Sequence, residues 1–74
     1  MNWDEIVTKR TLVKTKDKAG CGYVAAEFKD NLVVIAGNLV SHEYIIPKNK
    51  VENYDGKELS LNIHRDQINS DFNL

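Results

Sequence analysis

Residues 44–63 constrain the fold more than any other part of the chain, because they contain the end of one expected strand, a bend and a complete hairpin. Pro47 follows a run of strand-forming residues and ends it, since proline has no amide proton for a sheet ladder. The dipeptide Asp55-Gly56 is a strong signal for a tight hairpin turn. Apolar and polar residues then alternate over 57–64, as a half-buried strand requires. This segment predicts short strands joined by tight turns.

The preceding half of the chain has the same character. Strands are expected at 12–16, 22–28 and 32–36, with a hairpin turn at Asp30-Asn31 and a first turn over 17–20. The apolar side of each strand is predicted to form the core. That core consists of Leu12, Val24, Ala26, Phe28, Leu32, Val34, Tyr44, Ile46, Val51, Leu59, Leu61 and Ile63.

Together these strands predict an all-β fold. Five or six short strands in 74 residues are best accommodated by a small antiparallel β-barrel, because closure removes the open sheet edges. Asn2, followed three residues later by Glu5, predicts a short capped helical turn at the N-terminus. The segment 66–72 is expected either to form a helical turn or to fray.

The composition restricts the classes of function. The formal net charge is −1, which argues against the strong positive field of a dedicated nucleic-acid binder. Cys21 is the only cysteine, so an internal disulfide is excluded and a reducing compartment is expected. The first residues lack a basic and apolar leader, and no apolar run approaches a membrane span. We therefore expect a cytoplasmic protein without a membrane span.

Several phrases of the sequence carry a resemblance to a known family. They are Asp17 placed five residues before Gly22-Tyr23-Val24, the strand end Tyr44-Ile45-Ile46-Pro47, Val51, and Asp55-Gly56 leading into Leu59-Ser60-Leu61. In these phrases, which span residues 11–64, the chain resembles the PRC-barrel superfamily and its small stand-alone domains of unknown function. It departs from the family pattern at the first turn, where Lys18 follows Asp17 in place of the usual glycine.

The resemblance implies one domain over 1–74, with the barrel at 11–64, an N-terminal lid at 1–10 and a C-terminal tail at 65–74. Members of this superfamily include the cytoplasmic domain of a photosynthetic reaction-centre subunit, a domain of a ribosome-maturation factor and archaeal cell-division adaptors. These proteins use the barrel for binding or assembly and not for catalysis. The resemblance therefore implies a non-enzymatic protein-interaction or adaptor module.

The residue types that carry catalysis or metal binding are sparse. His42 and His64 are the only histidines, and a catalytic zinc site typically needs three protein ligands. Cys21 has no histidine at a spacing that suggests a nucleophile and its base, so a packing role between Gly20 and Gly22 in a turn is favoured. We expect no catalytic residues, no metal ligands, no cofactor and no small-molecule substrate.

The remaining signal is an apolar one on the strand faces opposite the predicted core. Tyr23, Val33, Ile35 and Ile45 are expected to face outward together, which predicts a binding surface for a protein partner or for a second copy in a homodimer. The alternative is that the apolar residues of the N-terminal segment 3–7 cover this surface as an intramolecular lid.

A second, basic surface is also suggested by strand alternation. Lys14, Lys16 and Lys18 would point to one side of an extended first strand. This arrangement favours phosphate contacts and makes a nucleic-acid- or ribosome-associated barrel the alternative function. Salt dependence separates the two hypotheses, because nucleic-acid binding weakens steeply with salt and an apolar interface does not.

Overall fold

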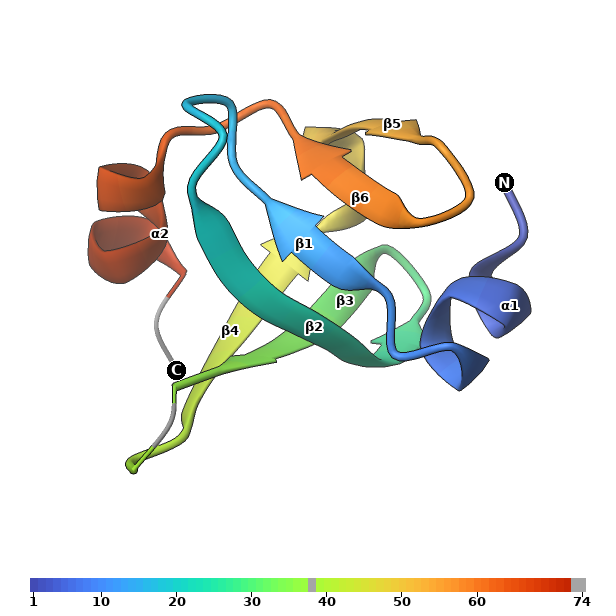
Figure 1. Cartoon of the computed structure of the whole chain (residues 1–74), viewed down its shortest axis with the longest axis horizontal. Helices are drawn as coiled ribbons and strands as arrows, with labels where there is room; N and C mark the ends of the chain where they lie inside the picture. The colour runs from blue at the N-terminus through green and yellow to red at the C-terminus, as the bar shows by residue number, and fades with distance from the viewer. Residues whose placement is uncertain (38, 73–74) are drawn as a thin grey trace.

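The computed structural model describes residues 1–37 and 39–72, which form a bent β-sheet with a short helix at either end of the chain (Figure 1). The elements occur close to the positions expected from the sequence. In chain order they are α1 (Trp3–Thr8), β1 (Leu12–Lys14), β2 (Gly20–Phe28), β3 (Asn31–Ala36), β4 (His42–Pro47), the 3-10 helix η1 (Lys48–Lys50), β5 (Val51–Tyr54), β6 (Glu58–Leu61) and α2 (Arg65–Asp71).

The six strands form one sheet in the order β4-β3-β2-β1-β6-β5. The expectation of a wholly antiparallel sheet is wrong for one pair, because β1 and β6 run parallel, with Val13 opposite Leu59. Tight turns force their two strands to be antiparallel, but most of the chain separates β1 from β6, so no turn sets their relative direction. Within the described residues no ladder joins the edge strands β4 and β5, and the bent sheet is therefore not closed into a barrel.

Helix α1 is capped as the sequence predicts. The side-chain oxygen of Asn2 accepts a hydrogen bond from the Glu5 amide at 3.2 Å, which satisfies one of the free amides of the first turn. Ile6 is fully buried in the core, and the Thr11 hydroxyl donates to the Ile6 carbonyl oxygen at 2.9 Å. The Tyr54 hydroxyl donates to a carboxylate oxygen of Glu5 at 3.1 Å. These contacts attach α1 to the sheet through both apolar and polar groups.

The core lies on one side of the sheet and largely confirms the sequence prediction. Two expected members are wrong, since the side chains of Leu12 and Phe28 are exposed, with 58% and 48% of their surface accessible. A third, Ala26, pairs with Val33 on the side of the sheet opposite the core, whereas Val51 is half-buried against the core. The buried residues that were predicted are Val24, Leu32, Val34, Tyr44, Ile46, Leu59, Leu61 and Ile63, and those that were not are Ile6, Val13, Cys21 and Ile68.

A β-bulge in β2 explains why Phe28 faces outward. Val24 lies opposite Val34, but Ala26 lies opposite Val33, so Ala25 is an extra residue in the ladder. An extra residue exchanges the two faces of the strand beyond it, because side chains alternate with a period of two. Beyond the bulge, Phe28 is therefore on the solvent side.

Glu27 takes the inward position beyond the same bulge, where Lys48 neutralises it. The Lys48 ammonium is 2.5 Å from a Glu27 carboxylate oxygen, and 20% and 26% of the two side chains remain exposed. The same ammonium lies 4.9 Å from the centroid of the Trp3 ring. This contact joins η1 to both β2 and α1, since one cation serves a carboxylate and an aromatic face.

The sequence predicted the β5–β6 turn correctly and placed the β2–β3 turn one residue too late. Asp55-Gly56 forms the β5–β6 turn as expected, and Gly56 has a φ of +93°. Hydrogen bonds from the amides of Glu58 and Lys57 lower the pKa of the Asp55 carboxyl below its ordinary value. The β2–β3 turn lies one residue earlier than expected, at Lys29-Asp30, because Lys29 takes the positive φ, +46°, that a tight hairpin requires.

The β1–β2 connection and the C-terminal helix are linked through Asp17. The Thr15 hydroxyl donates to its carboxylate and is the main reason that the pKa of Asp17 is lowered; the Arg65 amide also donates to it, at 3.3 Å. Helix α2 follows at Arg65, and its residue Ile68 is fully buried. The tail is thus helical over part of its length.

Candidate interaction surface

The side of the sheet opposite the core carries a group of apolar side chains that we call the outer face. Strand register brings them together, because Tyr23 on β2 lies opposite Ile35 on β3 and Val33 on β3 lies opposite Ile45 on β4. Directly paired residues share one face of a sheet. All four residues predicted from the sequence as an interface are therefore neighbours, and each is half-buried.

Two further apolar residues enlarge this surface. Leu12 on β1 lies opposite Tyr23, and Phe28 occupies the end of β2 beyond the bulge. The sequence pattern had assigned both residues to the core. The outer face consists of Leu12, Tyr23, Phe28, Val33, Ile35 and Ile45.

The N-terminal helix covers the other side of the sheet. Trp3, Ile6 and Val7 pack with the buried core residues, which alternate with those of the outer face along the same strands. Figure 1 shows α1 beside the end of β2, near the β2–β3 turn. The alternative that segment 3–7 covers Tyr23, Val33, Ile35 and Ile45 as a lid is therefore wrong, because this segment packs against the core on the other side of the sheet.

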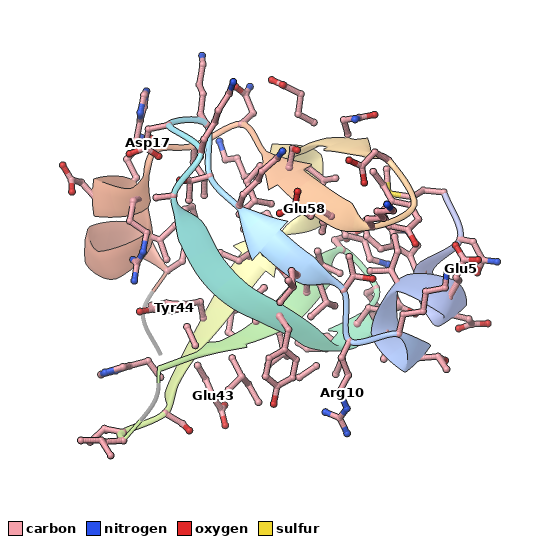
Figure 2. The ribbon with its side chains drawn as sticks, in the orientation of Figure 1. Glu5, Arg10, Asp17, Glu43, Tyr44 and Glu58 are labelled. Atoms are coloured by element: carbon pink, nitrogen blue, oxygen red, sulfur yellow. The ribbon has the colours of Figure 1, made fainter. Side chains whose placement is uncertain are left out.

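Two charged residues of opposite sign lie at the two sides of the outer face. The Arg10 guanidinium is 5.7 Å from the centroid of the Tyr23 ring, and Glu43 lies opposite Ile35 on the edge strand β4. Figure 2 shows both side chains at the lower side of the molecule, whereas Tyr44 next to Glu43 points in another direction. Across the described residues, neither Arg10 nor Glu43 forms an ion pair.

One row of directly paired residues crosses the outer face from strand β1 to strand β4. Strands in a sheet are about 4.8 Å apart, so Glu43 on β4 is roughly 10 Å from Tyr23 on β2. The Arg10 guanidinium, held above Tyr23, forms no ion pair with Glu43 of the same chain. From β1 to β4 the row reads Leu12, Tyr23, Ile35 and Glu43.

The three lysines of the alternative basic surface do not share one strand. Lys14 is the last residue of β1, and its ammonium lies 3.6 Å from a carboxylate oxygen of Glu58. Lys16 begins the turn that follows, and Lys18 has a φ of +64° within that connection. Asp17 lies between the latter two. The positive charge of this surface is therefore offset by two carboxylates.

The two histidines occupy separate structural positions. The His42 ring stacks against Tyr44, with centroids 6.5 Å apart, at the start of β4. His64 precedes α2, and its amide donates to the side chain of Gln67 at 2.9 Å. Over residues 1–37 and 39–72, no group of three or more potential ligands among His, Cys, Asp and Glu is close enough to hold a metal ion.

Cys21 lies in β2 and not in a turn as expected from the sequence. Its side chain is 1% exposed, and this burial raises the pKa of the thiol above its ordinary value. A raised pKa keeps the sulfur protonated at neutral pH, whereas a nucleophilic cysteine needs the thiolate. Cys21 therefore acts as a small apolar core residue.

The described part of the chain contains no detected pocket. None of its helices has the length and apolar character of a membrane-crossing helix. No protein-family model, curated protein or solved structure matches this chain. Within the described residues, the outer face and the charges beside it form the candidate functional surface.

Proposed function

We propose that this protein is a non-enzymatic interaction or assembly module, similar to the small PRC-barrel domains, that binds a protein through the outer face. The observation that carries the proposal is the contiguity of six apolar side chains on one side of the sheet, opposite the helix-covered core. Contiguous apolar surface of this kind is typical of association sites on small proteins.

The composition of the outer face favours a protein partner. Tyr23 and Phe28 are aromatic, and aromatic residues are enriched in the centres of protein interfaces, where lysine and glutamate are depleted. Val33, Ile35 and Ile45 are β-branched, so little rotamer entropy is lost when they become ordered at an interface. A broad apolar sheet face suits another protein surface better than a small molecule, which binds in a concave site.

Site-specific photo-crosslinking tests this proposal. Val33 is replaced by a photo-reactive aromatic amino acid in cells of the source organism, and Glu52, an exposed residue on β5, is replaced in the same way as the control. We expect a covalent protein adduct from position 33 and none from position 52. Because burial of apolar surface drives the association, adding Ile35→Lys should remove the adduct while circular dichroism shows a folded chain.

Two outcomes would contradict the proposal. Adducts of equal yield from positions 33 and 52 would mean that contacts are unspecific. Absence of any adduct from position 33, in cells where the protein is folded and abundant, would mean that the outer face has no protein partner.

A further inference from the structure

Two opposite charges at the two sides of the outer face are placed in a way that suits binding to a second copy of the same chain. Arg10 is fixed above the Tyr23 ring on one side of the central apolar row, and Glu43 extends from the edge strand on the other side. Each charge lacks an ion-pair partner among the described residues. In a two-fold interface, if residue i contacts residue j of the partner, then j contacts i. Two identical faces can thus supply two Arg10–Glu43 contacts.

The charges also select the direction of the two-fold axis. For two copies packed face to face the axis lies in the plane between the sheets. An axis perpendicular to the strands would place Arg10 against Arg10 and Glu43 against Glu43, and like charges in an interface are repulsive. An axis parallel to the strands reverses the row, so that Glu43 faces the β1 side of the other copy. Leu12 lies there, with the Arg10 guanidinium beside it above Tyr23, close enough to pair with Glu43.

The apolar residues are compatible with the same axis. If it runs between β2 and β3, the two strands exchange places in the second copy. Tyr23 then faces Ile35 of that copy, and Val33 faces Ala26, which is its neighbour in the β2–β3 ladder. In the contact between Val33 and Ala26, a larger side chain lies opposite a smaller one. Such a pair suits the interdigitation of side chains from two sheets packed about 10 Å apart.

We infer that the protein forms a two-fold symmetric homodimer in which the outer faces pack together, with each Arg10 paired to Glu43 of the second copy. This arrangement rests on the proposed role of the outer face and adds the identity of the partner and its orientation. The molecule measures 27 × 23 × 22 Å along its principal axes. Even one whole side therefore offers at most roughly 600 Å² per copy, or about 1,200 Å² in total, and the outer face fills only part of it, so the interface is small for a specific complex. We expect a reversible dimer with a micromolar dissociation constant.

Charge reversal in the full chain tests the pairing. Arg10→Glu and Glu43→Arg each replace two attractive contacts by two repulsive ones, and each should weaken dimerisation by about tenfold to thirtyfold in analytical ultracentrifugation at low salt. The double variant Arg10→Glu/Glu43→Arg regenerates both pairs and should dimerise like the wild type. A one-to-one mixture of the two single variants should form a heterodimer, since each Glu then faces an Arg.

Matched controls separate this pairing from a change in net charge. Lys57→Glu and Glu52→Arg make the same reversals at exposed positions in the β5–β6 hairpin, outside the outer face, and should leave the dissociation constant within about twofold. Circular dichroism of every variant confirms folding.

The results distinguish the dimer from the broader proposal. A wild-type chain that stays monomeric at high micromolar concentration overturns the homodimer, as does a position-33 adduct whose mass shows only a different protein; the latter leaves the protein-interaction proposal supported. Arg10→Glu acting no more strongly than Lys57→Glu overturns the proposed orientation. Recovery in both the double variant and the mixture supports it.

Discussion

Replacing Gly22 by alanine should strongly destabilise this protein, because the position combines a positive φ with a close approach of β3. Gly22 has a φ of +102°, a region that other residues occupy at a cost of about 1–3 kcal/mol. A Cβ atom at this position would lie 2.1 Å from the carbonyl oxygen of Ile35 and 2.8 Å from the Cβ of Ala36. Relieving the overlap by shifting β3 costs about a further 1–3 kcal/mol, as overpacking in a core does.

The expected loss for Gly22→Ala is therefore about 2–6 kcal/mol of unfolding free energy. A chain of 74 residues has a total stability of about 4–11 kcal/mol, so this loss is a large part of it. Two other glycines serve as matched controls. Gly56 has a similar φ of +93° but nothing within 4 Å, so Gly56→Ala should cost only the backbone contribution of about 1–3 kcal/mol. Gly20 has neither feature, and Gly20→Ala should change stability by less than about 1 kcal/mol.

The assay is equilibrium unfolding in urea, followed by the fluorescence of Trp3 and by circular dichroism. Trp3 is the only tryptophan and packs against the core, so its emission reports loss of tertiary structure. The midpoint and slope give the unfolding free energy of each variant. Equal losses for Gly22→Ala and Gly56→Ala would refute the close approach of β3 to Gly22. A similarly large loss for Gly20→Ala would refute the assignment of the cost to φ and overlap.

Three further predictions concern buried and charged groups. The buried thiol of Cys21, whose pKa burial raises, should react with a thiol reagent far more slowly in native buffer than in urea; equal rates would contradict its burial. The pKa values of Asp17 and Asp55 are lowered in the folded chain. The stability that these carboxylates contribute is therefore present above their unfolded pKa of about 3.9 and is lost as the pH falls through the folded pKa values. The urea midpoints of Asp17→Asn and Asp55→Asn should consequently depend less on acid pH than the midpoint of the wild type. Lys48→Met should lower the unfolding free energy by about 1–2 kcal/mol because Glu27 is left half-buried and unpaired, and adding Glu27→Gln should recover part of the loss.

The outer face illustrates what sequence reasoning could and could not locate. Tyr23, Val33, Ile35 and Ile45 were found because alternation assigns them to the side of their strands opposite the core. Phe28 was misassigned because the bulge at Ala25 reverses the alternation, and nothing in the local sequence marks an extra residue in a ladder. Leu12 was misassigned because β1 is only three residues long, too short for alternation to decide between it and Val13.

The charged residues beside the outer face depended on the tertiary structure entirely. Arg10 belongs to the connection after α1, and only the folded chain places its guanidinium above Tyr23. In the sequence Glu43 is an ordinary strand residue, and only the strand register shows that it lies opposite Ile35. The same holds for the parallel pairing of β1 with β6, which no turn predicts.

The sequence by itself determined the strands, the Asp55-Gly56 turn, the α1 cap and most of the core, because these depend on residues within a few positions of one another. Only the tertiary structure decided the β1–β6 pairing, the bulge that turns Phe28 outward and the side of the sheet that α1 covers. These features depend on contacts between segments that are distant in the chain, where many arrangements satisfy the same local pattern and packing selects one.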